Sequence, residues 1–176
     1  MSNLTLQELN SMIVVGMGDY KVTNGVNKLI TRDLGSCVGI AMWDPSTRIG
    51  GLLHIMLPQY IPNGFDDTMH HGMVNSAKYA DAGLDELVRT LVHRGADRRR
   101  LMAKIAGGAH MIACIGDTEQ SDISAKNAEA VRKKLQELQI PILAEEIGGH
   151  HPRTLVFDTT TGILRIITAG MEDRML

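Results

Sequence analysis

The sequence has 176 residues, 44% of them apolar, with 18 basic and 20 acidic residues and a net charge of −2. This composition is typical of a globular chain, and the charge balance gives no reason to expect a nucleic-acid partner or membrane insertion. Two cysteines without CxxC spacing argue against a disulfide framework and fit a reducing compartment. We therefore expect one domain over residues 1–176, located in the cytoplasm and without a signal peptide.

Strand-like apolar patterns dominate the first third of the chain. Residues 1–12 are weakly amphipathic and fit a loose tail or a short helix. Strands are predicted over residues 13–15, 20–22, 36–43 and 49–57. The segment 58–72 contains prolines and glycines and predicts a long loop, which would cover or border any site on the strand before it.

The rest of the chain alternates between helical and strand-like patterns. Apolar residues at helical spacing predict a helix over 74–94, which Gly95 ends as a C-cap. A polar loop at 116–122 precedes a second predicted helix over 124–139, with Ser124 as its N-cap. Further strands are predicted over residues 101–106, 140–147, 154–157 and 163–167. The pattern indicates an α/β (α+β) chain with many short strands and two substantial helices.

A cysteine and a histidine on neighbouring predicted strands are the strongest chemical signal. Cys37 and His54 are 17 positions apart and joined by a turn-rich connector, so we expect them to lie close together. A thiol is a poor nucleophile near neutrality unless a base or a positive charge raises its thiolate fraction. The pairing suggests covalent cysteine chemistry, in which a buried imidazole takes the thiol proton and forms an ion pair.

Each of these residues also has a simpler interpretation. An unpaired cysteine in a strand usually behaves as a small buried hydrophobe, and His54 fits a core histidine satisfied by a backbone carbonyl. The turn at Gly35-Ser36 favours the catalytic interpretation, because it would leave N–H groups unpaired beside the sulfur to stabilise an oxyanion. Cys114 lacks both features and is interpreted as core, so thiol reagents should label Cys37 first.

The remaining histidines and an arginine run invite binding hypotheses. Adjacent histidines generally point apart, and no pair has a zinc-like spacing, so solvated loops are favoured over a metal site. The residues concerned are His70, His71, His93, His110, His150 and His151. Arg98-Arg-Arg100 is interpreted as a solvated connection between a helix and a strand rather than a binding patch.

Several short motifs occur along the chain in an order that is typical of a known protein family. They are Leu34-Gly-Ser-Cys-Val-Gly39, Gly51-Leu-Leu-His-Ile-Met-Leu-Pro58, Lys78-Tyr-Ala-Asp81, Ala103-Lys-Ile-Ala-Gly-Gly-Ala109 with Met111, Asn127 with Ala130-Val131, and Leu143-Ala-Glu-Glu-Ile-Gly-Gly149 with Arg153. Together they resemble the CheD family, the chemoreceptor glutamine deamidases of bacterial chemotaxis. The resemblance covers roughly residues 18–167. It implies mixed β-sheets packed as a sandwich flanked by helices, a fold shared distantly with the cytotoxic necrotizing factors.

The resemblance also implies roles for individual residues. Cys37 matches the family's nucleophile, His54 its general base, and Thr31, six positions before the cysteine, the third residue that orients the imidazole. Backbone N–H groups near Ser36 and Cys37 are expected to bind the oxyanion, with Gly35 and Ser36 beside the substrate. No cofactor or metal is implied.

The implied substrates are glutamines on the cytoplasmic helices of chemoreceptors. Proteins similar to this one also bind CheC, a phosphatase of the response regulator, so the alternative is an interaction module that stimulates a CheC-type phosphatase. A general cysteine peptidase or transglutaminase is a third possibility.

One motif departs from the family pattern. The usual Ile-Gly-x-Arg-Asn is here Ile123-Ser-Ala-Lys-Asn127, with Ser124 in place of glycine and Lys126 in place of arginine. Lysine keeps the charge but loses the planar bidentate fork, so specificity would differ if this segment touches a substrate or a partner.

Overall fold

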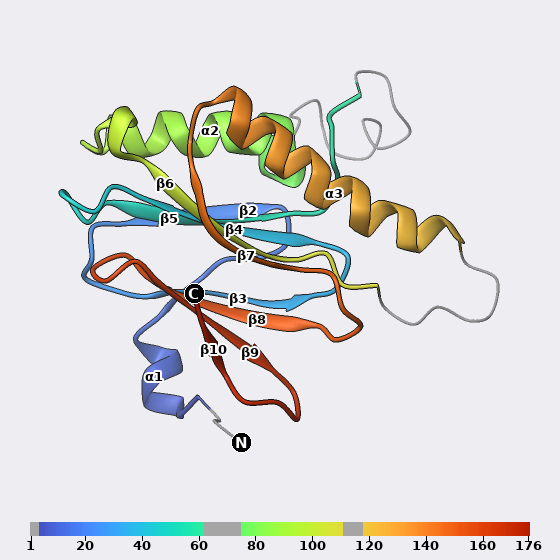
Figure 1. Ribbon diagram of the computed structural model, residues 1–176. Coiled ribbons are helices and arrows are strands. Elements are labelled where there is room, and N and C mark those ends of the chain that lie inside the picture. The colour runs from blue at the N-terminus through green and yellow to red at the C-terminus, as the bar shows by residue number, and fades with distance from the viewer. Residues whose placement is uncertain (1–3, 62–74, 111–117) are drawn as a thin grey trace.

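The structure is a computed structural model that describes residues 4–61, 75–110 and 118–176. Figure 1 shows three layers, with α2 and α3 lying over one sheet and a second sheet beneath it. The elements in chain order are α1 (Leu6–Asn10), β1 (Ile13–Val14), β2 (Asp19–Thr23), β3 (Leu29–Leu34), β4 (Val38–Trp43), β5 (Gly50–Ile55), the 3₁₀ turn η1 (Ser76–Lys78), α2 (Ala80–His93), the 3₁₀ turn η2 (Arg98–Arg100), β6 (Met102–Gly107), α3 (Thr118–Glu137), β7 (Ile142–Ile147), β8 (Arg153–Asp158), β9 (Ile163–Thr168) and β10 (Arg174–Met175).

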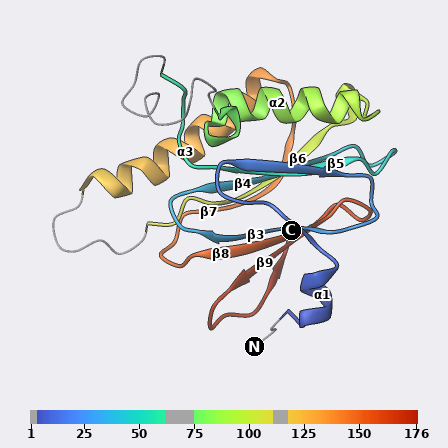
Figure 2. The ribbon, with the colours of Figure 1, turned by 180° about the vertical axis from the view of Figure 1, so that it is seen from behind.

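Both sheets have five strands and mixed directions. The sheet under the helices has the order β2-β5-β4-β6-β7, and the other has the order β1-β3-β8-β9-β10. Only the β6–β7 and β1–β3 pairs are parallel; the remaining pairs are antiparallel. The view from behind in Figure 2 shows the same stacking, with α2 and α3 on the outer face of the upper sheet. The predicted sandwich of mixed sheets flanked by helices is confirmed, with both long helices on one side.

Side chains of the central strands alternate between two cores. In β4, Val38, Ile40 and Met42 pack toward the helices, whereas Ala41 and Trp43 pack toward the second sheet. This two-sided burial explains why β4 is apolar throughout rather than alternating with polar residues. The same alternation in β5 sends Leu53 to the helix side and Leu52 to the side between the sheets.

Strand β3 was not predicted, although it forms one wall of the site described below. It begins with buried apolar residues, but Arg32 and Asp33 are exposed and break the apolar pattern. The register with β8 shifts between Thr31 and Leu34, and Asp33 has a φ of 58°. Both features mark a β-bulge, which sequence periodicity does not reveal because it inserts an extra residue.

The boundaries of the two long helices differ from the predicted ones. In place of a continuous helix over 74–94, Ser76–Lys78 form a 3₁₀ turn, and Tyr79 is extended and bridges to Leu57 before α2 begins at Ala80. Gly95 follows the helix with a φ of 105°, consistent with the predicted end. None of the helices in the described ranges is long and apolar enough to cross a bilayer.

Helix α3 begins at Thr118, so Ser124 is an internal helix residue and not the predicted N-cap. The Ser124 hydroxyl donates instead to the carbonyl of Ala109, at 3.0 Å. The early part of the helix is polar in sequence, and the segment 118–122 was therefore assigned to a loop. Polarity alone does not exclude a helix, because tertiary contacts further along can stabilise it.

One arginine of the basic run has a structural role. The Arg100 guanidinium donates to both carboxylate oxygens of Asp44, at 3.0 and 2.9 Å, and the Asp44 side chain is fully buried. The guanidinium holds the pKa of the Asp44 carboxyl far below its usual range. The Arg99 side chain is largely exposed, as expected for a solvated connection.

We expect Arg100→Ala to lower the free energy of unfolding by about 2–3 kcal/mol, because it leaves a buried carboxylate without its cation. The measurement is chemical denaturation at pH 7. Arg99→Ala is the matched control and should change the free energy by no more than about 0.5 kcal/mol. Equal effects of the two variants would contradict the assignment.

Candidate active site

His54 lies between the two sheets, in contact with a strand of each. Its position in β5 shares the inward face with Leu52, and its side chain is fully buried. Its cross-strand partner is Gly39, where a Cβ atom would lie 2.4 Å from Leu155 Cδ1 of the opposite sheet. The sheets therefore approach each other too closely for a side chain at residue 39, and the imidazole occupies the space beside it.

Thr31 of β3 makes the hydrogen bond that orients this imidazole. Its Oγ1 atom lies 2.7 Å from His54 Nδ1, and both side chains are fully buried. The bond joins the two sheets, since β3 and β5 belong to different ones. The other ring nitrogen, Nε2, is also buried and has no hydrogen-bond partner among the described residues. The ring is thus held at one nitrogen and vacant at the other.

Burial governs the charge of His54. Desolvation lowers its pKa from 6.5 to about 4, and the nearby Asp33 carboxylate opposes this with a smaller raising effect. The imidazole is therefore neutral at physiological pH. A neutral ring can accept a proton at Nε2 when Nδ1 carries the hydrogen and Thr31 Oγ1 accepts it.

Cys37 lies in the short connection that crosses from one sheet to the other. The chain leaves the lower sheet at Leu34 and enters the upper sheet at Val38, which pairs with Ile55. Extending this register by one residue places Cys37 opposite Met56, diagonal to His54 and on the same face. Such diagonal neighbours lie roughly 7–8 Å apart and are within reach of longer side chains. The sequence predicts Cys37 inside a strand over residues 36–43; the strand instead begins at Val38, one residue after the cysteine.

The thiol is half-buried and neutral at rest. Desolvation raises the pKa of Cys37, and hydrogen bonding to its own backbone N–H lowers it by less. The histidine pKa is lowered and the cysteine pKa is raised, so both shifts disfavour the thiolate–imidazolium pair that the sequence suggested. Both directions favour a neutral thiol and a neutral imidazole at rest, in which case proton transfer accompanies the attack on a substrate.

Three successive carbonyls of the cysteine turn are occupied by hydrogen bonds. The N–H of Ala109 donates to Gly35 O and that of Gly108 to Cys37 O, each at 2.7 Å. The side-chain amide of Asn127 donates to Ser36 O at 3.0 Å. The sequence assigns no chemical role to Asn127, because contacts between segments so far apart in the chain leave no local pattern.

The occupied carbonyls determine where the N–H groups of the turn point. In a trans peptide the C=O of one residue and the N–H of the next point in opposite directions, and the structure has no cis peptide among its described residues. The N–H groups of Ser36 and Cys37 therefore point away from Ala109 and Asn127, and neither donates a hydrogen bond to another described residue. Two adjacent N–H groups beside a thiol, neither of them bonded to another described residue, can stabilise an oxyanion.

Gly107 allows β6 to approach this turn. Its φ is 123°, and a Cβ atom there would lie 2.4 Å from the carbonyl oxygen of Cys37. The group that β6 approaches so closely is the protein's own cysteine turn. Any larger residue would displace the turn and break the bond from Gly108.

Other predicted features lie away from these residues or outside the described ranges. Cys114, His70, His71 and most of the predicted loop at 58–72 belong to the segments that are not described. Elsewhere, the rings of His110 and His150 are 6.4 Å apart. Within the described ranges no group of three or more histidine, cysteine or acidic side chains could hold a metal ion.

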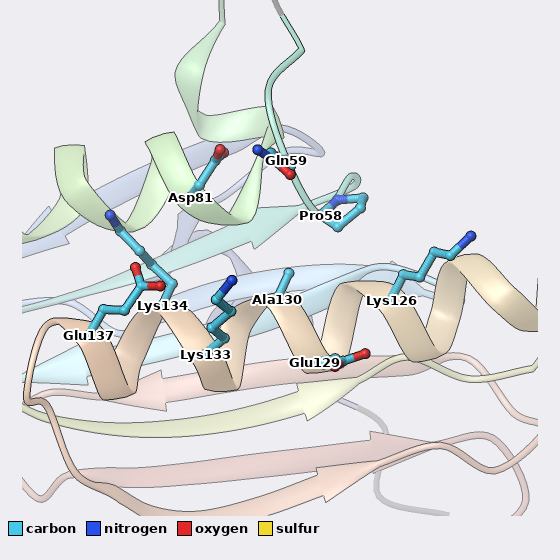
Figure 3. A pocket seen from close by; sticks show the side chains of 9 residues that line it. All are labelled: Pro58, Gln59, Asp81, Lys126, Glu129, Ala130, Lys133, Lys134 and Glu137. Atoms are coloured by element: carbon cyan, nitrogen blue, oxygen red, sulfur yellow. The ribbon is translucent and has the colours of Figure 1, made fainter.

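A separate groove of about 400 Å³ lies beside α3 and contains none of the three predicted catalytic residues. Figure 3 shows its lining, with side chains from α3 facing Pro58, Gln59 and Asp81. Lys126, the lysine that departs from the family pattern, is on its wall. The lysine at 126 therefore alters this groove, whereas Ser124, the other residue that departs from the pattern, bonds to Ala109 O.

We expect the stability of the protein to fall as the pH is lowered from 6.5 to 4. The pKa of His54 is lower in the folded state than in the unfolded state, so the unfolded state binds more protons in this window and stability is lost on acidification. The neutral His54 is expected to contribute about 3 kcal/mol to the free energy of unfolding at pH 6.5. Urea denaturation at several pH values between 6.5 and 4 measures the loss of this contribution. His54→Gln should remove it, and an unchanged pH dependence in that variant would refute the assignment.

We also expect the alkylation of Cys37 by iodoacetamide to accelerate about tenfold per pH unit between pH 6 and pH 8, because the thiolate fraction of a thiol with a raised pKa grows in that proportion. Peptide mass spectrometry after timed quenching gives the rate. A rate independent of pH over this range would instead show a resting ion pair.

Comparisons with known proteins identify relatives of this chain. A family model described as CheD chemotactic sensory transduction matches residues 56–168. A relative from Moorella thermoacetica, called probable chemoreceptor glutamine deamidase CheD, is 46% identical over 160 residues, covering 90% of this chain and 91% of that protein. A relative of the same name from Clostridium tetani is 43% identical over 157 residues, covering 89% and 91%.

The matches to these relatives are long enough to include the site. Because 160 of 176 residues are matched in the first of them, the span has to contain residues 31–54. Among solved structures, the Bacillus licheniformis hypothetical protein YfiH has a TM-score of 0.45 and 16% identity, covering 75% of this chain and 51% of that one. Because the family model matches residues 56–168 and a relative is 46% identical over 90% of the chain, the chain belongs to the CheD family.

Proposed function

We propose that this protein is a chemoreceptor glutamine deamidase, which hydrolyses the side-chain carboxamide of receptor glutamines to a carboxylate and releases ammonia. The names of its relatives support the activity. The observation that carries the chemistry is the bond from Thr31 Oγ1 to His54 Nδ1, which leaves Nε2 as the one vacant nitrogen of a neutral, buried ring. Cys37 is the proposed nucleophile because the extended register of β4 and β5 puts it on the same face of the sheet as His54.

The first half of the reaction forms a thioester. Nε2 of His54 takes the thiol proton as the Cys37 sulfur attacks the carboxamide carbon, and the carbonyl oxygen becomes an oxyanion. The N–H groups of Ser36 and Cys37 are placed to bind that oxygen. When the intermediate collapses, the imidazolium gives its proton to the departing nitrogen, and ammonia leaves.

The second half regenerates the enzyme. A water molecule gives a proton to Nε2 and its oxygen attacks the thioester carbon, and the returning proton restores the thiol as glutamate is released. The low pKa of His54 favours the steps in which the imidazolium acts as an acid. Thr31 accepts from Nδ1–H throughout and keeps the proton-accepting nitrogen on the side of the sulfur.

We further propose a CheC-type phosphatase as a second partner and the cytoplasm as the location. The partner is supported by the family resemblance, and the location by the substrate, since the receptor helices concerned are cytoplasmic. A purely binding role is the alternative function. It is separated from the deamidase by asking whether Cys37→Ala keeps phosphatase binding while losing deamidation.

We expect wild-type protein to convert specific glutamines of a receptor cytoplasmic fragment to glutamate, with a mass increase of about 1 Da at each site, and Cys37→Ala to convert none because no thioester forms. Intact and peptide mass spectrometry provide the measurement. Cys114→Ala is the matched cysteine control and should retain activity. Conversion by Cys37→Ala would remove the nucleophile assignment, and the absence of conversion by wild type would favour the binding role.

We expect Thr31→Val to lower kcat for deamidation by about 10–100-fold, because valine has a similar shape but leaves Nδ1 without a partner and the ring without a set tautomer. Thr31→Ser keeps the hydroxyl and should retain most of the activity. Steady-state kinetics on the same receptor fragment measure both. If Thr31→Val were as active as Thr31→Ser, the hydroxyl would have no orienting role.

A further inference from the structure

Asn127 connects the two halves of the candidate site. It lies in α3 with its side chain fully buried, and its Nδ2 atom donates to Ser36 O at 3.0 Å and to Met56 O at 2.9 Å. Ser36 belongs to the cysteine turn, and Met56 follows the end of the strand that carries His54. One side-chain amide thus joins the segment of the predicted nucleophile to the segment of the predicted base.

The orientation of this amide is determined by its partners. Both acceptors are carbonyl oxygens, so only the NH₂ end of the asparagine can face them. The Oδ1 atom is buried and has no hydrogen-bond partner among the described residues. An unpaired buried acceptor is unfavourable, so the two donated bonds are what hold the side chain in place.

The bond to Ser36 O controls the direction of the Cys37 N–H, one of the two proposed oxyanion donors. Ser36 O and Cys37 N–H belong to the same rigid peptide plane, so a donor that fixes the carbonyl also fixes the direction of the N–H. The neighbouring carbonyls of Gly35 and Cys37 are held by backbone donors, which any sequence with this fold would supply. The middle peptide alone depends on a side chain.

We infer that Asn127 is a positioning residue for deamidation, whose amide keeps the Cys37 N–H aimed at the developing oxyanion. The inference rests on the proposed function and names a residue that acts through the backbone of the turn, without touching the substrate. It predicts an effect on the step in which negative charge develops on oxygen, and little effect on substrate binding or on the thiol itself.

The test compares deamidation with a reaction of the same thiol that forms no oxyanion. Asn127→Asp keeps the shape of the side chain but removes both donors, and Asn127→Ala removes the amide altogether. Iodoacetamide alkylates a thiolate by displacing iodide at a saturated carbon, so it requires no oxyanion donor. The measurements are kcat and KM on a receptor fragment, and the alkylation rate of Cys37 at the same pH.

We expect kcat to fall about 100-fold in both variants, in line with the loss of an oxyanion donor, while KM stays within about twofold of wild type and the alkylation rate within about threefold. Thermal melts show whether each variant is folded. If the buried aspartate prevents Asn127→Asp from folding, Asn127→Ala alone provides the test. An unchanged kcat, or alkylation falling in parallel with deamidation, would overturn the inference.

Ser124→Ala is the matched control from the same helix. Ser124 is as buried as Asn127 and also donates to a backbone carbonyl, that of Ala109, a residue outside the cysteine turn. Family members usually have glycine at this position, so a small kinetic effect is expected. A 100-fold loss here would indicate that α3 docking in general is required and would overturn the inference. Absence of deamidation by wild type would overturn the proposed function itself, and this inference with it.

Discussion

The hydrogen bond between Thr31 and His54 is the interaction on which the rest of the site depends. It joins the two sheets within the layer between them and buries an imidazole there, in addition to the ion pair between Arg153 of β8 and Glu146 of β7. A polar pair inside such a layer is tolerated only when it is hydrogen-bonded. The hydrogen bond fixes the imidazole ring and leaves its Nε2 atom vacant. The orientation of the ring therefore depends on how β3 and β5 are placed relative to each other.

Burial of this pair determines the charge state of the site. Low polarity around the imidazole and the thiol disfavours their charged forms, so the pair rests as two neutral groups. The resting enzyme therefore differs from cysteine enzymes that hold a preformed thiolate. A neutral thiol reacts slowly near neutral pH, and in the proposed mechanism the sulfur becomes nucleophilic as His54 takes its proton during attack on the carboxamide.

The turn that carries Cys37 is shaped by contacts from two other segments, the end of β6 and helix α3. Two backbone donors from residues 108 and 109 and the side chain of Asn127 occupy successive carbonyls. Gly107 allows this approach because it has no side chain to collide with the turn. The N–H groups are consequently turned toward the open side. The orientation of the proposed oxyanion donors thus depends on how β6 and α3 pack, even though these donors belong to the turn itself.

The sequence by itself determined the class of the fold, the strands of the central sheet, the candidate residues Thr31, Cys37 and His54, and the family. These conclusions depend on local periodicity and on short ordered motifs, which are properties of the chain alone. Only the tertiary structure decided the strand order, the bulge in β3, the start of α3 before Ser124, the neutral charge state and the role of Asn127. Each of these results from contacts between segments far apart in the chain or from burial between layers, and neither is encoded in any single stretch of residues.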